Sequence, residues 1–295
     1  MKYLAIITDT WRESWARRTS IVLGVIVIMI LVTYGLGFQI APSEVTPGEV
    51  NIGFFSTPSD SRNDISLPSF SLELISSVSA ILTLGTLSPW GVFLGLFIAA
   101  TLFVPIFQSQ RLYWVLAKPL SRVGLLLSKY IGALILVAIT TMVFISIMMG
   151  LIGLKTGIYK PELLIGGLIM IFIFAIYSSV ALLVAIWTRN TALSLISTIL
   201  LHIVSSVLFA ARSTQELTAF IPESWQAGID FIYMILPKAS DLETLATQLL
   251  STNVEAISAE ISTITVDVPL VMGTSGTFMI VMLALAAWEF HRRDY

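Results

Sequence analysis

The segment RLYWVLAKPLSRVGLLLSKYIG, residues 111–132, lies between two long apolar stretches of the chain. It contains no acidic residue and carries Arg111, Lys118, Arg122 and Lys129. Translocation of Lys and Arg across a membrane is disfavoured when these residues lie in short loops. The segment is therefore expected on the cytoplasmic side, between two membrane-spanning helices.

Two helices separated by a proline are predicted within this segment. Apolar residues recur at helical spacing in 112–116, which indicates a short helix. That helix ends at Pro119, because the residue before a proline is pushed out of the α region. Ser121 is then placed to cap the next helix, which enters the membrane from Leu125. A short interfacial helix held between two spans is suited to being pushed from the cytoplasm.

Two motifs here, LAKPLSR at 116–122 and SKYIG at 128–132, resemble the loop between the second and third spans of type-2 ABC transporter permeases. In that family the helix before the Lys-Pro pair docks on the ATP-hydrolysing subunit and is called the coupling helix. The family commonly has an acidic residue and a Gly-Thr pair just upstream, where this chain has QSQRL at 108–112. The resemblance implies ATPase-coupling roles for Arg111, Trp114, Lys118, Pro119, Ser121, Arg122 and Lys129.

The composition is that of an integral membrane protein. The 295 residues are 56% hydrophobic and only 12% charged, and the mean hydropathy is +0.92. The chain has no cysteine, which excludes disulfides and thiolate metal sites.

Long charge-free windows predict six membrane spans, because each charge at the centre of a span costs about 2.5–3.5 kcal/mol. The expected organisation is a single permease domain, 1–295, with an interfacial elbow helix at 2–18, spans at 19–41, 88–107, 125–153, 162–187, 191–211 and 270–290, external loops at 42–86 and 212–268, and a coupling helix at 108–120. With this topology 11 of the 16 basic residues are cytoplasmic and 14 of the 18 acidic residues are external. Both termini are then expected in the cytoplasm.

Residues 2–18 form a candidate amphipathic helix in the cytoplasmic interface. Its apolar residues fall within an arc of about 80°, with Ile6 as an exception on the polar side; they are Leu4, Ile7, Trp11 and Trp15. A simple positively flanked membrane anchor is the alternative. Type-2 permeases begin with an elbow helix near the ATPase, and the resemblance implies that role for Trp11, Arg12, Glu13 and Trp15.

The two external loops are long enough to form a small mixed α/β part. A strand is predicted at 50–54, and a helix from Pro68 to Gly85 is expected to lie along the membrane, with a re-entrant segment as the alternative. The second loop predicts helices at 214–235 and 241–252, a capping box at 240–243 and a strand at 264–268. The acidity of the loops suits a solvated surface or a basic partner.

Several kinds of chemistry are not indicated. The sequence has no Gly-x-x-x-x-Gly-Lys-(Ser/Thr) loop, no His-Glu-x-x-His motif and no paired carboxylates within a span. His202, deep in a predicted span, is either a pH sensor or substrate contact, or a hydrogen-bonding group between helices. Met142, Met148 and Met149 are better explained as packing residues than as ligands along a path for a soft metal ion.

The resemblance implies an all-α polytopic protein that serves as the membrane subunit of an ATP-driven exporter or mechanotransmission complex. It is similar to the permease of the nitrous-oxide-reductase maturation group. The chain itself would be no enzyme and would bind no cofactor or metal; two ABC ATP-binding subunits would bind ATP and Mg. Its other expected partners are a second permease subunit as a homodimer, an external protein and membrane lipid, without nucleic acid. It is expected in the inner or plasma membrane. The alternative is a membrane scaffold or sensor without an ATPase.

Overall fold

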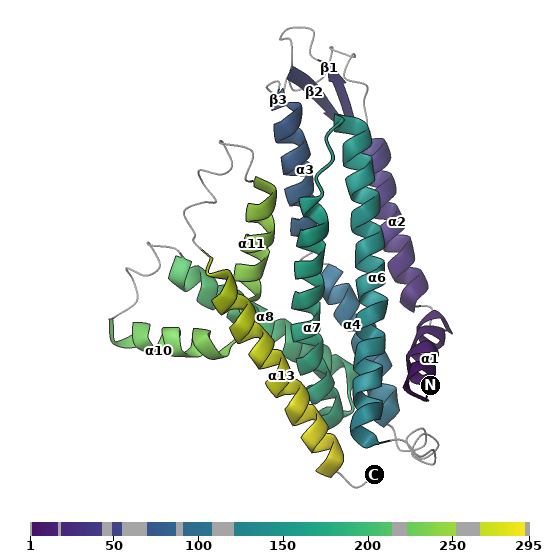
Figure 1. Cartoon of the computed structure of the whole chain (residues 1–295), viewed down its shortest axis with the longest axis vertical. Coiled ribbons are helices and arrows are strands. Elements are labelled where there is room, and N and C mark those ends of the chain that lie inside the picture. The colour runs from purple at the N-terminus through teal and green to yellow at the C-terminus, as the bar shows by residue number, and fades with distance from the viewer. Residues whose placement is uncertain are drawn as a thin grey trace.

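The structure is a computed structural model. It describes residues 2–16, 19–42, 49–54, 70–86, 91–107, 121–213, 223–251 and 266–292. These residues are mostly helical, and their helices gather around α7, with a small sheet at one end (Figure 1).

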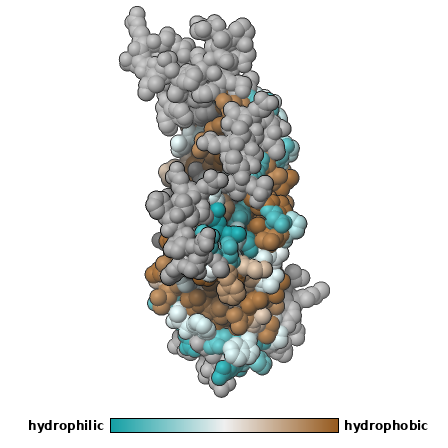
Figure 2. Space-filling model, turned by 90° about the vertical axis from the view of Figure 1, so that its left-hand side faces the viewer, coloured by the Kyte–Doolittle hydropathy of each residue, from teal (hydrophilic) through white to brown (hydrophobic). Residues whose placement is uncertain are grey.

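Four helices in the described residues are long and apolar enough to cross a membrane: α6 (Arg122–Thr156), α7 (Glu162–Thr188), α8 (Thr191–Ser213) and α13 (Val268–Arg292). They overlap the last four predicted spans. α6 is about 52 Å long at 1.5 Å per residue, which exceeds the hydrocarbon core of about 30 Å. Figure 2 shows a broad hydrophobic area below a hydrophilic patch at mid-height, as expected for a membrane protein.

The first two predicted spans contain shorter helices. α2 (Thr19–Gly37) is mostly apolar and contains no charged residue, and α4 (Val92–Phe103) has only 12 residues. α4 gives way to the 3-10 turn η2 (Val104–Phe107), because Pro105 has no backbone N–H to continue the α-helical pattern. The count of six spans therefore stays a prediction.

α7 is the most deeply buried helix of the four, and two adjacent glycines bring it close to its neighbours. A Cβ on Gly166 would meet the Leu84 side chain of α3 (Leu72–Thr86), and a Cβ on Gly167 would meet Ile145 of α6. These two glycines therefore allow close packing of α7 against α3 and α6.

α3 runs upright beside α6 in Figure 1, along the axis of the bundle. It buries Ile75, Ala80 and Leu84, and it packs against α6, α7 and α11 (Ala239–Ser251). This differs from the expected helix lying flat along the membrane, because one side of α3, which also buries Ser76, Ser77, Ser79 and Thr83, is used for packing within the bundle.

A three-stranded antiparallel sheet lies at the upper end of Figure 1, in the order β1-β2-β3. Its strands are β1 (Phe38–Pro42), β2 (Glu49–Phe54) and β3 (Phe70–Ser71). Phe38 pairs with Phe54, and Glu49 pairs with Ser71. β2 covers the residues whose alternation predicted a strand.

Two predictions for the second loop are wrong where the structure describes it. Val268 begins α13, and Asp267 caps this helix through a 3.3 Å bond from the Leu270 N–H, so Val268 does not belong to a strand. α11 begins at Ala239, so Ser240 lies inside the helix and donates to Ser206 Oγ at 3.3 Å in place of capping. The predicted helix at 214–235 appears as α10 (Glu223–Ile235); residues 214–222 and 252–265 lie outside the described part.

Candidate functional site

The N-terminal helix α1 (Lys2–Ala16) packs against the first half of α6. The face that it buries is formed by Ile6, Thr10 and Ser14, and the last two are fully buried. Thr10 Oγ1 donates to the Ile6 carbonyl at 2.8 Å, so the buried hydroxyl has a partner. Ile6 is thus no exception to the amphipathic pattern, since a second face of α1 contacts protein.

Gly132, the last residue of the SKYIG motif, lies where α1 crosses α6. A Cβ at this position would be 3.1 Å from Thr10 Oγ1 and 3.2 Å from Thr10 Cβ. These distances are tighter than ordinary van der Waals contacts. A side chain at 132 would therefore push the two helices apart.

Lys129 lies one turn before Gly132 and forms a buried ion pair with α1. Its Nζ is 3.1 Å from Glu13 Oε2 and 4.0 Å from Asp9 Oδ2, and 8% of its side chain is exposed. An ammonium group taken out of water needs a paired carboxylate, because its desolvation costs several kcal/mol. We call Thr10, Glu13, Lys129 and Gly132 the elbow clamp.

Other residues of the two motifs fix the start of α6. Ser121 has extended backbone angles (φ −70°, ψ 139°), and its Oγ accepts from the Gly124 N–H at 3.1 Å, so the predicted cap is confirmed. Tyr130 donates its hydroxyl to the Ala175 carbonyl of α7 at 2.7 Å. The beginning of α6 is therefore held by α1 on one side and by α7 on another.

The chain is also held where it enters the segment before α6. Phe107, at the end of η2, is buried, and its ring lies 5.5 Å from that of Phe290 on α13 in an edge-to-face contact. Leu125 and Leu126 of α6 are buried beside these rings. The described residues on either side of 108–120, Phe107 and Ser121, are therefore both held in the bundle.

The remaining predicted site residues fall into three groups. Arg111, Trp114, Lys118 and Pro119 lie in 108–120, outside the part of the chain that the structure describes. Arg122 is the half-buried first residue of α6. On α1, Trp11 and Arg12 are exposed. Trp15 belongs to the same helix, but its side chain lies outside the part that the structure describes.

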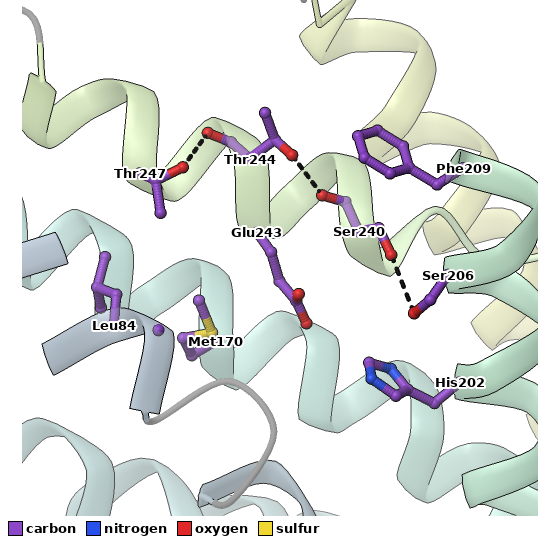
Figure 3. Close-up of a pocket in the computed structure, with 10 residues that line it drawn as sticks. Leu84, Met170, His202, Ser206, Phe209, Ser240, Glu243, Thr244 and Thr247 are labelled. Carbon is purple, nitrogen blue, oxygen red and sulfur yellow. Dashed lines mark hydrogen bonds between the residues drawn. The ribbon is translucent and has the colours of Figure 1, made fainter. Parts of the chain in front are cut away.

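A second candidate site is a cavity of about 510 Å³ between α3, α7, α8 and α11 (Figure 3). Its lining residues are Leu84, Gly85, Met170, His202, Ser206, Phe209, Ser240, Glu243, Thr244 and Thr247. His202 Nδ1 is 3.0 Å from the hydroxyl of Tyr177 on α7. The interpretation of His202 as a hydrogen-bonding group between helices is confirmed. Sequence reasoning missed Glu243, which it placed in a capping box.

A polar cluster beside the cavity joins α8, α10, α11 and α13. Lys238 is fully buried and donates from Nζ to Thr274 Oγ1 at 2.8 Å and from its backbone N–H to Ser275 Oγ at 3.1 Å. Tyr233 donates to Asp241 Oδ2 at 2.6 Å. Burial lowers the pKa of Lys238 and raises that of Asp241; for Tyr233, burial and the bond to Asp241 raise the pKa.

Arg212 completes this cluster at the end of α8. Its Nε lies 2.9 Å from Asp230 Oδ1, and its guanidinium carbon lies 4.0 Å from the centre of the Tyr233 ring. The Leu236-Pro237 turn is fixed as well, because Ser205 donates to the Pro237 carbonyl at 2.6 Å. The cluster therefore fixes the positions of α10 and α11 relative to α8 and α13.

Neither a scan against models of protein families nor a search of curated proteins finds a match for this chain.

Proposed function

We propose that this chain is the membrane subunit of an ATP-driven ABC exporter or mechanotransmission complex, in which a separate subunit hydrolyses ATP. The proposal is supported by the LAKPLSR and SKYIG motifs, which resemble the coupling loop of type-2 ABC permeases. The chain itself performs no hydrolysis in this mechanism. It is a two-state element whose equilibrium the partner shifts.

The observation that carries the proposal is the buried ion pair between Lys129 of α6 and Glu13 of α1. A displacement of residues 108–120 enters α6 through Ser121, which caps it. α1 follows α6, because Lys129 of the elbow clamp links the two helices about two turns from that entry. Tyr130 transmits the same displacement to α7 through its bond to Ala175. One push on the loop therefore moves three helices together.

The proposed topology has six spans, with α2 and α4 in the first two. α1 is the interfacial elbow helix, and the coupling helix lies within 108–120. β1–β3 with α10 and α11 form the external part. In the inner or plasma membrane both termini would then face the cytoplasm, as the distribution of basic residues favours.

The proposed assembly contains two such chains, as a homodimer, and two ABC ATP-binding subunits that hold ATP and Mg. Closure of the ATPase pair would push the coupling helices and tilt the spans. Two modes fit this motion: export of a substrate, or transmission of force to an external protein. Deleting residues 45–66 separates them, since an exporter with a lateral gate keeps its activity and a mechanotransmitter loses it.

The experiment that tests the proposal is purification of the tagged chain from native membranes, with mass spectrometry of the co-eluting proteins and an ATPase assay. We expect an ABC ATP-binding subunit to co-elute and to be lost in Lys118→Glu. A chain that elutes alone and without ATPase activity refutes the proposal and supports a membrane scaffold or sensor.

A further inference from the structure

The cavity between α3, α7, α8 and α11 has the size and lining of a small-molecule site. Its volume of about 510 Å³ lies within the range of ligand pockets, which is about 300–1,000 Å³. One part of the wall is apolar and consists of Leu84, Met170 and Phe209. The other part carries a carboxylate, an imidazole and several hydroxyl groups. A ligand with an apolar body and a polar end would fit this division.

Glu243 supplies the formal negative charge of the cavity. Figure 3 shows its carboxylate directed from α11 into the cavity, toward the ring of His202 on α8. The described residues that line the cavity include no Lys or Arg. The buried Lys238 beside the cavity directs its ammonium group to Thr274 on α13. The cavity therefore favours a positively charged ligand over an anion.

Three hydroxyl groups in the wall, those of Ser240, Thr244 and Thr247, present acceptors, because their hydrogens are used in other hydrogen bonds. Thr244 donates to the Ser240 carbonyl at 2.8 Å, and Thr247 donates to the Thr244 carbonyl at 2.8 Å. Ser240 donates to Ser206 Oγ at 3.3 Å. The oxygens of these donors keep lone pairs for a donor-rich group. An ammonium group, which has only donors, matches such a wall.

The rest of the cavity wall is held in place by contacts with its neighbours and suits the apolar part of an organic ligand. The His202 ring is fixed by its bond to Tyr177 and by edge-to-face contacts with Phe93 and Tyr177, at 5.4 and 5.6 Å between ring centres. Phe209 offers an aromatic face for cation-π contact, and Met170 adapts to irregular shapes. A bare metal ion fits less well, since the described residues contain no group of three or more His, Cys, Asp or Glu that could hold one.

We propose that this cavity binds a small organic ammonium ion, with its charged end at Glu243 and its apolar body against Leu84, Met170 and Phe209. The binding requires no ATPase partner, so this inference stands or fails separately from the proposed function.

The absence of cysteine from the chain allows a direct test by single-cysteine labelling. Thr247→Cys places a thiol in the wall at a residue whose hydroxyl bonds only its own helix. The purified full-length variant in lipid nanodiscs is treated with a trimethylammonium-ethyl or a sulfonatoethyl methanethiosulfonate reagent. We expect the ratio of cationic to anionic labelling rates to exceed that of free cysteine by about tenfold, from the attraction of Glu243.

Glu243→Gln in the Thr247→Cys background should return the ratio to that of free cysteine. Glu73→Gln is the matched control, because Glu73 is an exposed carboxylate outside the cavity lining and should leave the ratio unchanged. Gel filtration checks that each variant remains folded. A ratio that is no higher than that of free cysteine, or one that Glu243→Gln does not change, overturns the proposal.

Protection from labelling tests the ligand class with a defined pair of probes. 2-Phenylethylammonium should slow labelling of Thr247→Cys by an uncharged maleimide, and 2-phenylethanol at the same concentration should not. Glu243→Gln should abolish the protection. Equal protection by the alcohol, or no protection by the amine up to its solubility limit, contradicts recognition of an ammonium ion.

Discussion

Lys129 Nζ lies 3.1 Å from Glu13 Oε2, and this contact joins helices whose paired residues are 116 positions apart in the sequence. Only 8% of the Lys129 side chain and 17% of the Glu13 side chain are exposed. Loss of one partner from a buried ion pair leaves an uncompensated charge, which is more costly than loss of both. The pair is therefore expected to act as a unit.

Glu13→Gln should lower the stability of the protein by about 1–3 kcal/mol, because it leaves the Lys129 ammonium with the more distant Asp9 carboxylate. Adding Lys129→Met to Glu13→Gln should recover much of this loss. Thermal unfolding in detergent measures both effects. Arg12→Gln, at an exposed neighbouring position, is the control; a Glu13→Gln variant as stable as Arg12→Gln would show that the pair contributes nothing.

Gly132→Ala should also weaken the contact between α1 and α6. The added methyl group would stand 3.1 Å from Thr10 Oγ1, and overpacking of this kind costs about 1–3 kcal/mol. Gly150→Ala is a matched control on the same helix, because no atom lies within 4 Å of a Cβ there, and it should raise stability by up to about 1 kcal/mol through helix propensity. Thermal unfolding measures the stability of both variants. Equal changes in stability would contradict a steric role for Gly132.

The sequence predicts well those features that depend on local pattern. Four long apolar helices follow from charge-free windows, and the Ser121 cap follows from its place after Pro119. The pairing of Lys129 with Glu13 could not be predicted, because it depends on how α1 crosses α6. The one sequence signal for a contact between α1 and α6 was Ile6, an apolar residue on the polar side of α1. Ser240 was misjudged because a hydroxyl before a helix also suits a contact between helices, and its bond to Ser206 is tertiary.

Asp241→Asn should change how stability depends on pH. Burial raises the pKa of Asp241 above 3.8, so the folded state holds the proton more tightly than the unfolded state. The contribution of this carboxyl to stability is then greatest below 3.8 and falls as the pH rises through the raised pKa. An asparagine accepts the same bond from Tyr233 without this loss.

The variant should therefore match the parent protein near about pH 4 and have the higher melting temperature of the two at neutral pH. Asp230→Asn, at the exposed carboxylate that pairs with Arg212, should bring no such gain. Melting curves between these pH values provide the measurement. A neutral-pH melting temperature below that of the parent would mean that attraction to Lys238 and Arg212 outweighs the burial of Asp241.

Lys118→Glu and Pro119→Ala should each uncouple ATP hydrolysis from transport, if residues 108–120 dock on an ATPase as proposed; in Lys118→Glu this happens because the ATPase subunit no longer binds the chain. Reversal of the charge would remove the proposed contact, and without the proline the predicted short helix would continue toward Ser121, so the proposed push would no longer be delivered to the start of α6. Both variants leave the elbow clamp intact and should keep the parent melting temperature. ATPase and transport rates, measured together, test this, and unchanged transport in both variants would refute the docking role.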